Sequence, residues 1–449
     1  MKGKLTETDN RTSGLRDSVI RKNCHALGEE PKTERLSADT GNRDIAIGFI
    51  TGRRSFRHTL KTYLLRWKNT SGFIAEKTNI HLIVAYDLSY NNTQIDDYIR
   101  IKPELKRTLS SITFLGEEEI TAMRDGIVRY GILTAEQAQR VIGTGYAGKR
   151  NAVLLQAIWQ NMDCLIFLDD DEYPLAVSNN HDYAVWSGQN VFNEHIAALR
   201  DADVTNGFHC GYLSPIPCFR FDSEAERTAF RELIEAVSND AVNWPRVSNL
   251  MKTRGVTYAD TDVLLHHTVT TLCESSADGM PITGSNLGLN LTRPERTKPF
   301  FNPPKARGED TFFGLMLHER SVKRIPVYTF HDGFMKYYDI LNGVLPIHLS
   351  PVDEDSPKTR TRFYRACLGW VRYKPLYLYL TDPDGYGEKE KDTEQHLRKA
   401  APALTQYFQT PSFNRLLPEF RRYARRVQQD AETFSAIQED WAQLMKAVP

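Results

Sequence analysis

The sequence predicts an α/β fold, in which a mostly parallel central sheet has helices on both faces and a C-terminal helical region follows. Three observations predict this architecture. Short apolar runs alternate with segments of helical apolar spacing, which is typical of strand–helix–strand units. Several of these runs are apolar almost throughout, as strands covered on both faces are. Beyond about residue 346 only helical spacing remains.

The expected elements of the first half follow one another in a regular order. Apolar runs bounded by Gly or Asp mark strands, and apolar residues three or four positions apart mark helices. In chain order they are a strand at 44–51, a helix at 55–67, strands at 80–86 and 111–115, a helix at 152–160 and a strand at 164–168.

The second half is less regular. Strand-like pieces at 207–213, 282–291 and 327–331 lie around a helix at 224–237. The helical patterns at 359–380 and 394–448 contain prolines, which remove a helix hydrogen bond. We therefore expect helix breaks at Pro375, Pro402, Pro411 and Pro418. The predicted units are a flexible polar tail (1–43), a main α/β domain (44–346) and a helical extension (347–449).

Composition excludes several classes of protein. Lys plus Arg and Asp plus Glu both number 57, and this balance argues against a dedicated nucleic-acid binder. None of the six cysteines forms a Cys-x-x-Cys pair, which argues against a disulfide framework or a cysteine zinc site. The polar N-terminus indicates no secretory signal, and no apolar stretch approaches the ~20 residues of a membrane span. We expect a soluble cytoplasmic protein; its oligomeric state has no signal in the sequence.

The strongest functional motif is the acidic run Asp169-Asp170-Asp171, which directly follows the strand at 164–168. Ligands bind beyond the carboxyl ends of parallel strands, where Thr51 and Asp87 are also expected. Clustered carboxylates repel one another unless a cation compensates them, and Mg²⁺ or Mn²⁺ prefers such oxygen ligands. Taken alone, the run is more often a solvated turn; its context favours the metal site.

That context consists of three further motifs. Lys149 and Arg150 follow two glycines before the helix at 152–160, and they offer cations to a phosphate group, although the segment also suits an ordinary loop. Glu309 and Asp310 begin an apolar helix, where carboxylates serve either as caps or as general bases. His331 ends a strand, where a histidine is usually structural but is also a metal ligand.

Together and in this order, these motifs resemble the glycosyltransferases of the GT-A fold (a Rossmann-like fold), especially the large inverting family with DxD and Glu-Asp motifs. That family includes polysaccharide and O-antigen sugar transferases, and the resemblance spans roughly residues 44 to 335. It implies that 44–346 is a GT-A catalytic domain. It also implies a metal-dependent enzyme of the hexosyltransferase type that uses a nucleotide-sugar donor and a glycan or lipid-linked glycan acceptor.

The resemblance also implies roles for individual residues. Asp310 would be the general base, and Glu309 would help to position the acceptor. Asp171 would bind Mn²⁺ or Mg²⁺, and His331 would be a further metal ligand or a contact to the diphosphate. The residues expected to bind the nucleotide sugar are Thr51, Asp87, Lys149, Arg150, Asp169 and Asp170. The triple acidic run permits two registers, so the assignment of Asp170 stays open between donor and metal. The segment 282–286 resembles the acceptor-side loop of the family.

The sequence departs from the family in two places. The first strand ends in Thr-Gly-Arg-Arg instead of the usual Pro-x-Tyr-Asn type of opening, so Arg53 and Arg54 receive no role. The Gln-x-x-Arg-Trp motif of processive synthases does not occur, which favours transfer of a single sugar. Three alternatives remain open: a retaining transferase, a sugar nucleotidyltransferase, and a non-catalytic glycan-binding protein of the same fold.

The C-terminal helical patterns combine basic and aromatic residues, as in 415–426. Such helices lie on anionic membranes in some proteins, and here they would bring the enzyme to the inner face of the membrane, near a lipid-linked acceptor. Alternatively they form a cap whose apolar side chains pack on the main domain. The cap is the favoured interpretation.

Overall fold

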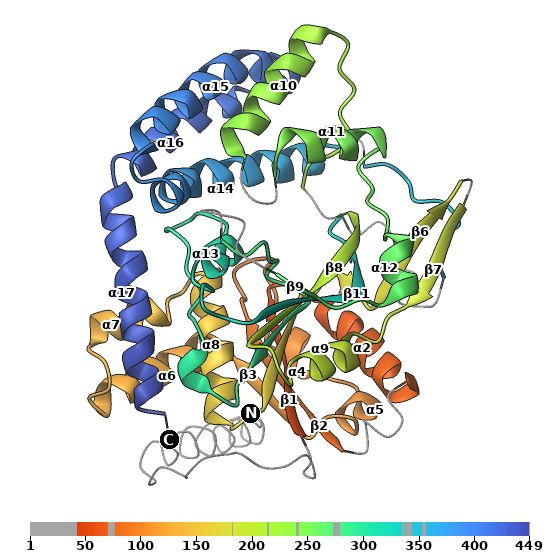
Figure 1. Ribbon diagram of the computed structural model, residues 1–449, viewed down its shortest axis with the longest axis vertical. Coiled ribbons are helices and arrows are strands. Elements are labelled where there is room, and N and C mark those ends of the chain that lie inside the picture. Colours follow the sequence, from red (N-terminus) through yellow and green to blue (C-terminus); the bar gives the residue numbers. More distant parts are fainter. Residues whose placement is uncertain are drawn as a thin grey trace, which may run out of the picture.

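The computed structural model describes residues 43–70, 77–181, 183–212, 215–238, 242–272, 279–334, 337, 344–352 and 356–448. The tail predicted for 1–43 lies outside these residues except for its last position. Within them the chain forms a central sheet surrounded by helices, with a second group of helices at one end (Figure 1). The predicted α/β class, with a mostly parallel sheet and a C-terminal helical region, is confirmed.

The sheet has the strand order β3-β2-β1-β4-β10-β8-β11-β5, with β9 paired to β11. Strands β3, β2, β1 and β4 are parallel neighbours, and β11 is parallel to β8. Within the described part of this sheet, β10, β5 and β9 run antiparallel to their partners, and β6 and β7 form a separate antiparallel hairpin. The strands are β1 (Arg43–Thr51), β2 (Thr78–Tyr86), β3 (Ser111–Leu115), β4 (Cys164–Leu168), β5 (Glu172–Tyr173), β6 (Leu175–Asn180), β7 (Tyr183–Gly188), β8 (Val204–Tyr212), β9 (Thr270–Thr271), β10 (Leu287–Asn290) and β11 (Val322–Asp332).

The helices carry the labels used in Figure 1. They are α2 (Phe56–Thr70), α4 (Asp96–Ile99), α5 (Pro103–Lys106), α6 (Glu117–Arg129), α7 (Ala135–Val141), α8 (Tyr146–Trp159), α9 (Val191–Ala198), α10 (Glu224–Val237), α11 (Trp244–Lys252), α12 (Thr261–His266), α13 (Glu309–Leu315), α14 (Pro357–Thr381), α15 (Tyr386–Tyr407), α16 (Leu416–Ala424) and α17 (Val427–Lys446). Two short 3-10 helices cover Pro294–Arg296 and Pro411–Arg415.

Both faces of the sheet are covered, which explains why its strands are apolar almost throughout. Along β1, Ile45, Ile47 and Phe49 join one hydrophobic cluster with α2 and α9. Ala46 and Ile50 face the opposite side and join a second cluster with α6 and α8. Because side chains alternate between the faces of a strand, a strand between two helical layers must be apolar on both.

The structure corrects several predicted boundaries. Helix α8 begins at Tyr146, so Lys149 and Arg150 lie in its first turns and not in a loop. Pro375 and Pro402 lie inside the continuous helices α14 and α15. The predicted breaks there are wrong; each proline removes one helix hydrogen bond, but both helices are held by tertiary packing.

The other two prolines do fall at helix starts. Pro411 begins a 3-10 helix and Pro418 lies in the first turn of α16, where a missing backbone N–H costs little. The strand expected at 282–291 is confined to 287–290. Its first part has no strand partner, and the backbone of Thr283 donates instead to the Asn206 side chain.

The C-terminal helices share a core with the main domain. The rings of Phe363 in α14 and Phe408 after α15 pack edge-to-face against Phe219, which precedes α10. Helix α17 then runs back along the molecule (Figure 1), where Phe434 packs on Phe301. The helical group is therefore fixed to the α/β unit by buried aromatic contacts.

The basic–aromatic segment follows the cap arrangement. Phe420 and Tyr423 of α16 are buried, while Arg421 forms an ion pair with Glu394 of α15 at 2.7 Å. The apolar side of this helix is thus already covered by protein. Among the described residues, no helix is long and apolar enough to cross a membrane.

Candidate functional site

The polar residues of the site gather where several parallel strands end. Thr51 ends β1, Asp87 follows β2 and Asp169 follows β4. Strand β11 runs in the same direction as β4, since β10 between β4 and β8 is antiparallel to both and β11 is parallel to β8. His331, near the end of β11, therefore reaches the same edge of the sheet. This is the edge at which α/β proteins bind ligands.

The guanidinium of Arg53 contacts two carboxylates of the acidic run. Its Nη1 donates to Asp170 Oδ1 at 3.0 Å and also to Asp171 Oδ2. The Thr51 hydroxyl donates to the other oxygen of Asp170 at 2.5 Å. The arginine for which the sequence indicated no role thus supplies the positive charge that holds two neighbouring carboxylates together.

The third element of this group is His331. Its Nε2 lies 3.5 Å from Asp171 Oδ1, and its Nδ1 donates to the backbone carbonyl of Tyr212 on the adjacent strand β8. The backbone N–H of Asp332 donates to the Asp171 carbonyl at 2.8 Å. The end of β11 is therefore fastened to the acidic run, and the ring orientation of His331 is set.

Burial and pairing move the pKa values of this group in opposite directions. Burial, opposed by Arg53, raises the pKa of Asp170 to about 7. Burial also acts against the charged form of Asp171, but Arg53 and His331 outweigh it and hold the pKa of Asp171 well below its usual range. For His331, burial lowers the pKa, but the charge of Asp171, its hydrogen bond, the charge of Glu172 and the Tyr212 carbonyl together outweigh burial and raise the pKa to about 9.

Arg150 organises a second group of carboxylates. Its guanidinium is buried, donates to the Gly284 carbonyl at 2.6 Å, and lies 3.8 Å from Asp169 and 3.6 Å from Glu309. It also lies over the rings of Tyr146, Phe167 and Phe300. Arg150 therefore joins α8, the end of β4 and the start of α13.

Glu309 and Asp310 begin α13, as the sequence predicts. Burial and the neighbouring charge of Asp310, opposed by Arg150, raise the pKa of Glu309 to about 7. Asp310 is half-buried, and one of its oxygens accepts the Thr311 backbone N–H at 3.0 Å.

Lys149 and Asp87 form a third group. Lys149 Nζ pairs with Asp87 Oδ2, and the Ser89 hydroxyl donates to the other Asp87 oxygen at 2.6 Å. The structure thus sorts the predicted residues into three neighbouring groups: Thr51, Asp170, Asp171 and His331 with Arg53; Asp169 and Glu309 with Arg150; and Asp87 with Lys149.

Glu172 is a buried acid that the sequence analysis did not single out. Its Oε2 accepts hydroxyl hydrogen bonds from Ser285 and Thr329, both at 2.8 Å, and its Oε1 lies 3.3 Å from His209. The Ser285 oxygen also accepts the Asp169 backbone N–H at 3.0 Å. Segment 282–286, which was expected to contact an acceptor, therefore supports the acidic run through Ser285.

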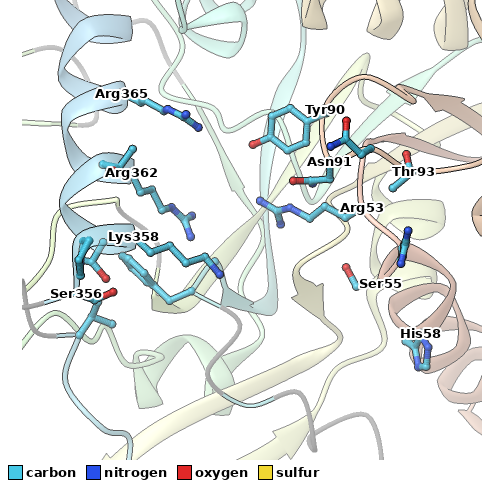
Figure 2. A pocket seen from close by; sticks show the side chains of 18 of the residues that line it. Arg53, Ser55, His58, Tyr90, Asn91, Thr93, Ser356, Lys358, Arg362 and Arg365 are labelled. Atoms are coloured by element: carbon cyan, nitrogen blue, oxygen red, sulfur yellow. The ribbon is translucent and has the colours of Figure 1, made fainter.

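A cleft of about 1610 Å³ opens beside Arg53. It is bounded on one side by the start of α2 and the loop after β2, and on the other by the first turns of α14 (Figure 2). Arg53 connects it to the acidic run. The sequence motifs gave no indication that α14 lines this cleft, because α14 belongs to the C-terminal extension and lies far from the motifs in the sequence.

Asp171 and His331 are the residues that would hold a divalent metal if a bound phosphate group supplied further ligands. Among the residues that the structure describes, no three His, Cys, Asp or Glu side chains form a complete metal site. Asp171 and His331 offer two ligands, and the Tyr212 carbonyl fixes the His331 Nδ1 proton so that Nε2 faces Asp171. Mg²⁺ and Mn²⁺ sites of this kind are completed by water and substrate phosphates.

The solved structures that are similar to the chain include two mannosyltransferases. The mannosyltransferase PcManGT from Pyrobaculum calidifontis, in complex with GDP-Man and Mn²⁺, aligns with a TM-score of 0.31 and 12% identity, covering 94% of this chain and 93% of that one. The mannosyltransferase Ktr4p from S. cerevisiae, in complex with GDP, aligns with a TM-score of 0.18 and 11% identity, covering 48% of this chain and 53% of its own. No protein-family model and no curated protein matches the chain.

Proposed function

We propose that this protein is a metal-dependent glycosyltransferase, which transfers a single sugar from a nucleoside-diphosphate sugar to a hydroxyl group of a glycan acceptor. The observation that carries the proposal is the pairing of Asp171 with an oriented His331 at the carboxyl edge of the sheet. Two carboxylates, Glu309 and Asp310, begin a helix nearby, and Glu309 is linked to Asp169 of the acidic run through Arg150. The proposed metal–phosphate site would therefore lie near the candidate base.

The donor would lie along the strand ends. Asp87 and Lys149, after β2 and in α8, are proposed to contact the nucleotide, and Asp169 its ribose or phosphates. Asp171 and His331 would hold the divalent metal, which when bound neutralises negative charge on the departing diphosphate. Arg53 is well placed to share that task, since its guanidinium already lies against Asp170 and Asp171.

The transfer step is assigned to Asp310. Its carboxylate would accept the proton of the acceptor hydroxyl while that oxygen forms a bond to the anomeric carbon. The bond from the anomeric carbon to the diphosphate oxygen breaks, and its electron pair leaves with the nucleoside diphosphate. Attack opposite the leaving group inverts the configuration. Glu309 would position the acceptor beside Asp310.

A binding screen tests the proposal. Nucleoside diphosphates (uridine, guanosine, adenosine and cytidine) are added with and without Mn²⁺, and the thermal stability of the protein is followed. We expect at least one nucleotide to raise the melting temperature only when Mn²⁺ is present, because a ligand that binds the native state stabilises it. If no nucleotide shifts the melting temperature, or if Mn²⁺ makes no difference, the metal-dependent donor site is refuted.

Product analysis then separates the alternatives. An inverting enzyme yields the anomer opposite to that of the donor, whereas a retaining enzyme preserves it, and NMR of the product distinguishes them. A sugar nucleotidyltransferase would instead release pyrophosphate from a nucleoside triphosphate and a sugar phosphate. A non-catalytic protein of this fold would bind the nucleotide sugar without turnover of any acceptor.

A further inference from the structure

The cleft beside the acidic run has a strongly cationic lining. Six arginines and one lysine line it, and no Asp or Glu is among the described residues that do so. The chain as a whole has no net charge, so this concentration of positive charge is local. Clefts lined by one sign of charge focus the field and attract ligands of the opposite sign.

Some of these cations already have partners. Arg53 pairs with Asp170 and Asp171, Arg54 pairs with Asp97 at 3.1 Å, and Arg57 donates to the Arg100 carbonyl at 2.8 Å. The cations of α14 are different. Within the part of the chain that the structure describes, Lys358, Arg362 and Arg365 have no carboxylate within ion-pair distance. Their charge is thus not neutralised by any described carboxylate.

Cationic side chains of α14 point across the cleft toward Arg53 on the opposite wall. Figure 2 shows the side chains of Lys358 and Arg362 extending from α14 toward Arg53, which extends from the opposite wall. The guanidinium of Arg362 is fixed by the ring of Phe334, with 4.5 Å between its central carbon and the ring centroid. Phe334 lies three residues after His331, so this contact holds Arg362 near the end of β11.

Like charges face one another here. Burial lowers the pKa of Arg362; Asp171 opposes this effect, and the guanidiniums of Arg53 and Arg307 add to it. A bound anion would relieve that repulsion. In addition, α2 and α14 both begin at the cleft, and helix N-termini carry partial positive charge and free N–H groups that favour phosphate.

We propose that this cleft binds a phosphate-bearing ligand through Lys358, Arg362 and Arg365 of α14, with Arg53 at its border with the acidic run. A guanidinium group can donate two parallel hydrogen bonds to two oxygens of one phosphate group. A cleft lined by such groups therefore suits a phosphate better than a neutral sugar. The inference deepens the proposed function, on which it rests for the source of the phosphate: the diphosphate of the donor, or a phosphate group on the acceptor. In both cases the C-terminal extension supplies part of the binding site.

Calorimetry with inorganic pyrophosphate in metal-free buffer tests the cleft itself. We expect the double variant Lys358→Gln/Arg362→Gln to bind pyrophosphate at least about tenfold more weakly than the wild type, since two charge-assisted contacts are lost. The matched control is Lys391→Gln/Arg398→Gln, which removes the same charge from exposed positions of α15 and should retain wild-type affinity.

Two results would overturn the proposal: a wild-type protein that does not bind pyrophosphate, or a cleft variant that binds it as tightly as the control. Because Arg362 is partly buried, the exposed single variant Lys358→Glu serves if the double variant does not fold. A charge reversal there should weaken pyrophosphate binding at least as much as neutralisation does.

The source of the phosphate is decided by a second titration, with nucleoside diphosphate and Mn²⁺. If the cleft holds the donor diphosphate, the cleft variant loses affinity for the nucleotide; if it holds a phosphate on the acceptor, nucleotide affinity is unchanged. Failure of the cleft is also distinct from failure of the proposed function. A protein that binds nucleotide with Mn²⁺ but not pyrophosphate lacks only the cleft site, and the reverse pattern refutes the donor site.

Discussion

Nε2 of His331 lies 3.5 Å from Oδ1 of Asp171, while Nδ1 of the same ring is held by the Tyr212 carbonyl. The two residues come from distant parts of the sequence and meet because β11 and β4 end at the same edge of the sheet. A histidine whose Nδ1 donates to a carbonyl presents Nε2 as a ligand once Nε2 has lost its proton, which a bound metal favours. This pair therefore anchors the predictions about metal.

The variants Asp171→Asn and His331→Gln are expected to weaken Mn²⁺-dependent nucleotide binding at least about tenfold, because each removes one of two proposed protein ligands. Calorimetry with nucleoside diphosphate at fixed Mn²⁺ measures the effect. Asp201→Asn is the control, since Asp201 is an exposed carboxylate paired with Lys323 away from the site. Wild-type affinity in both site variants would rule out the Asp171–His331 metal site.

The variant Asp310→Asn is expected to retain nucleotide binding but to lose turnover by at least about 100-fold, since general bases contribute rate factors of this order. Steady-state transfer measures kcat, and calorimetry measures nucleotide affinity. Glu309→Gln should slow transfer less, because that residue is assigned to acceptor positioning. Substantial turnover by Asp310→Asn would remove the assignment of Asp310 as the base.

The variant Arg53→Gln leaves the Asp170 and Asp171 carboxylates without their shared cation. We expect the free energy of unfolding in metal-free buffer to fall by about 3 kcal/mol, as is typical when one partner of a buried ion pair is removed. Added Mn²⁺ should then stabilise the variant more than the wild type, because the metal ion replaces the missing charge. Urea titrations with and without Mn²⁺ measure both effects.

Arg54→Gln is the matched control for Arg53→Gln. Arg54 is the next residue, but its side chain is 65% exposed and pairs with Asp97, so its loss should cost less than about 1 kcal/mol. Equal destabilisation of the two variants, or an equal gain from Mn²⁺, would contradict the role given to Arg53.

His195 predicts a pH dependence of stability away from the acidic run. It is fully buried; its Nε2 donates to Asn286 Oδ1 at 2.9 Å and its Nδ1 accepts the Thr205 hydroxyl at 2.7 Å. Burial, opposed by the hydrogen bond to Asn286, lowers the pKa of His195 to about 4. Well above pH 6.5, His195 is neutral in both the folded and the unfolded protein, so it does not change the free energy of unfolding there. Between pH 6.5 and 4 only the unfolded state gains the proton, and stability falls as pH falls.

The maximal loss from this histidine is about 3 kcal/mol, at 1.36 kcal/mol for each pKa unit. Urea unfolding at pH 7.5 and pH 5 should show a smaller pH effect in His195→Gln than in the wild type, by about 2 kcal/mol. The exposed His318 provides the control variant His318→Gln, which should keep the wild-type pH dependence. An unchanged pH effect in His195→Gln would mean that His195 is not the titrating group.

Much of the fold could be predicted because the local pattern and the tertiary requirement coincide. The strands at 111–115 and 164–168 and the helix at 224–237 have the predicted bounds. Strands buried on both faces must be apolar whatever surrounds them. The helix breaks at Pro375 and Pro402 were wrong because burial of these helices against other elements outweighs one lost hydrogen bond in each.

Part of the candidate site could also be predicted from the sequence, and part could not. That Thr51, Asp87 and Asp169 lie together follows from the direction of parallel strands, which the alternation of strands and helices indicates. The position of the Arg150 side chain could not be predicted in this way. A sequence shows a cation before a helix but not that its guanidinium is buried between Asp169 and Glu309.

By itself, the sequence determined the sheet, the edge at which the acidic run lies and the helix that carries Glu309 and Asp310, since these depend on local spacing and on strand direction. Only the tertiary structure decided that Arg53 neutralises Asp170 and Asp171, and that Arg362 arrives from α14 to face Arg53 across the cleft. Such pairings join residues from distant segments, and no periodicity along the chain encodes the packing that brings those segments together.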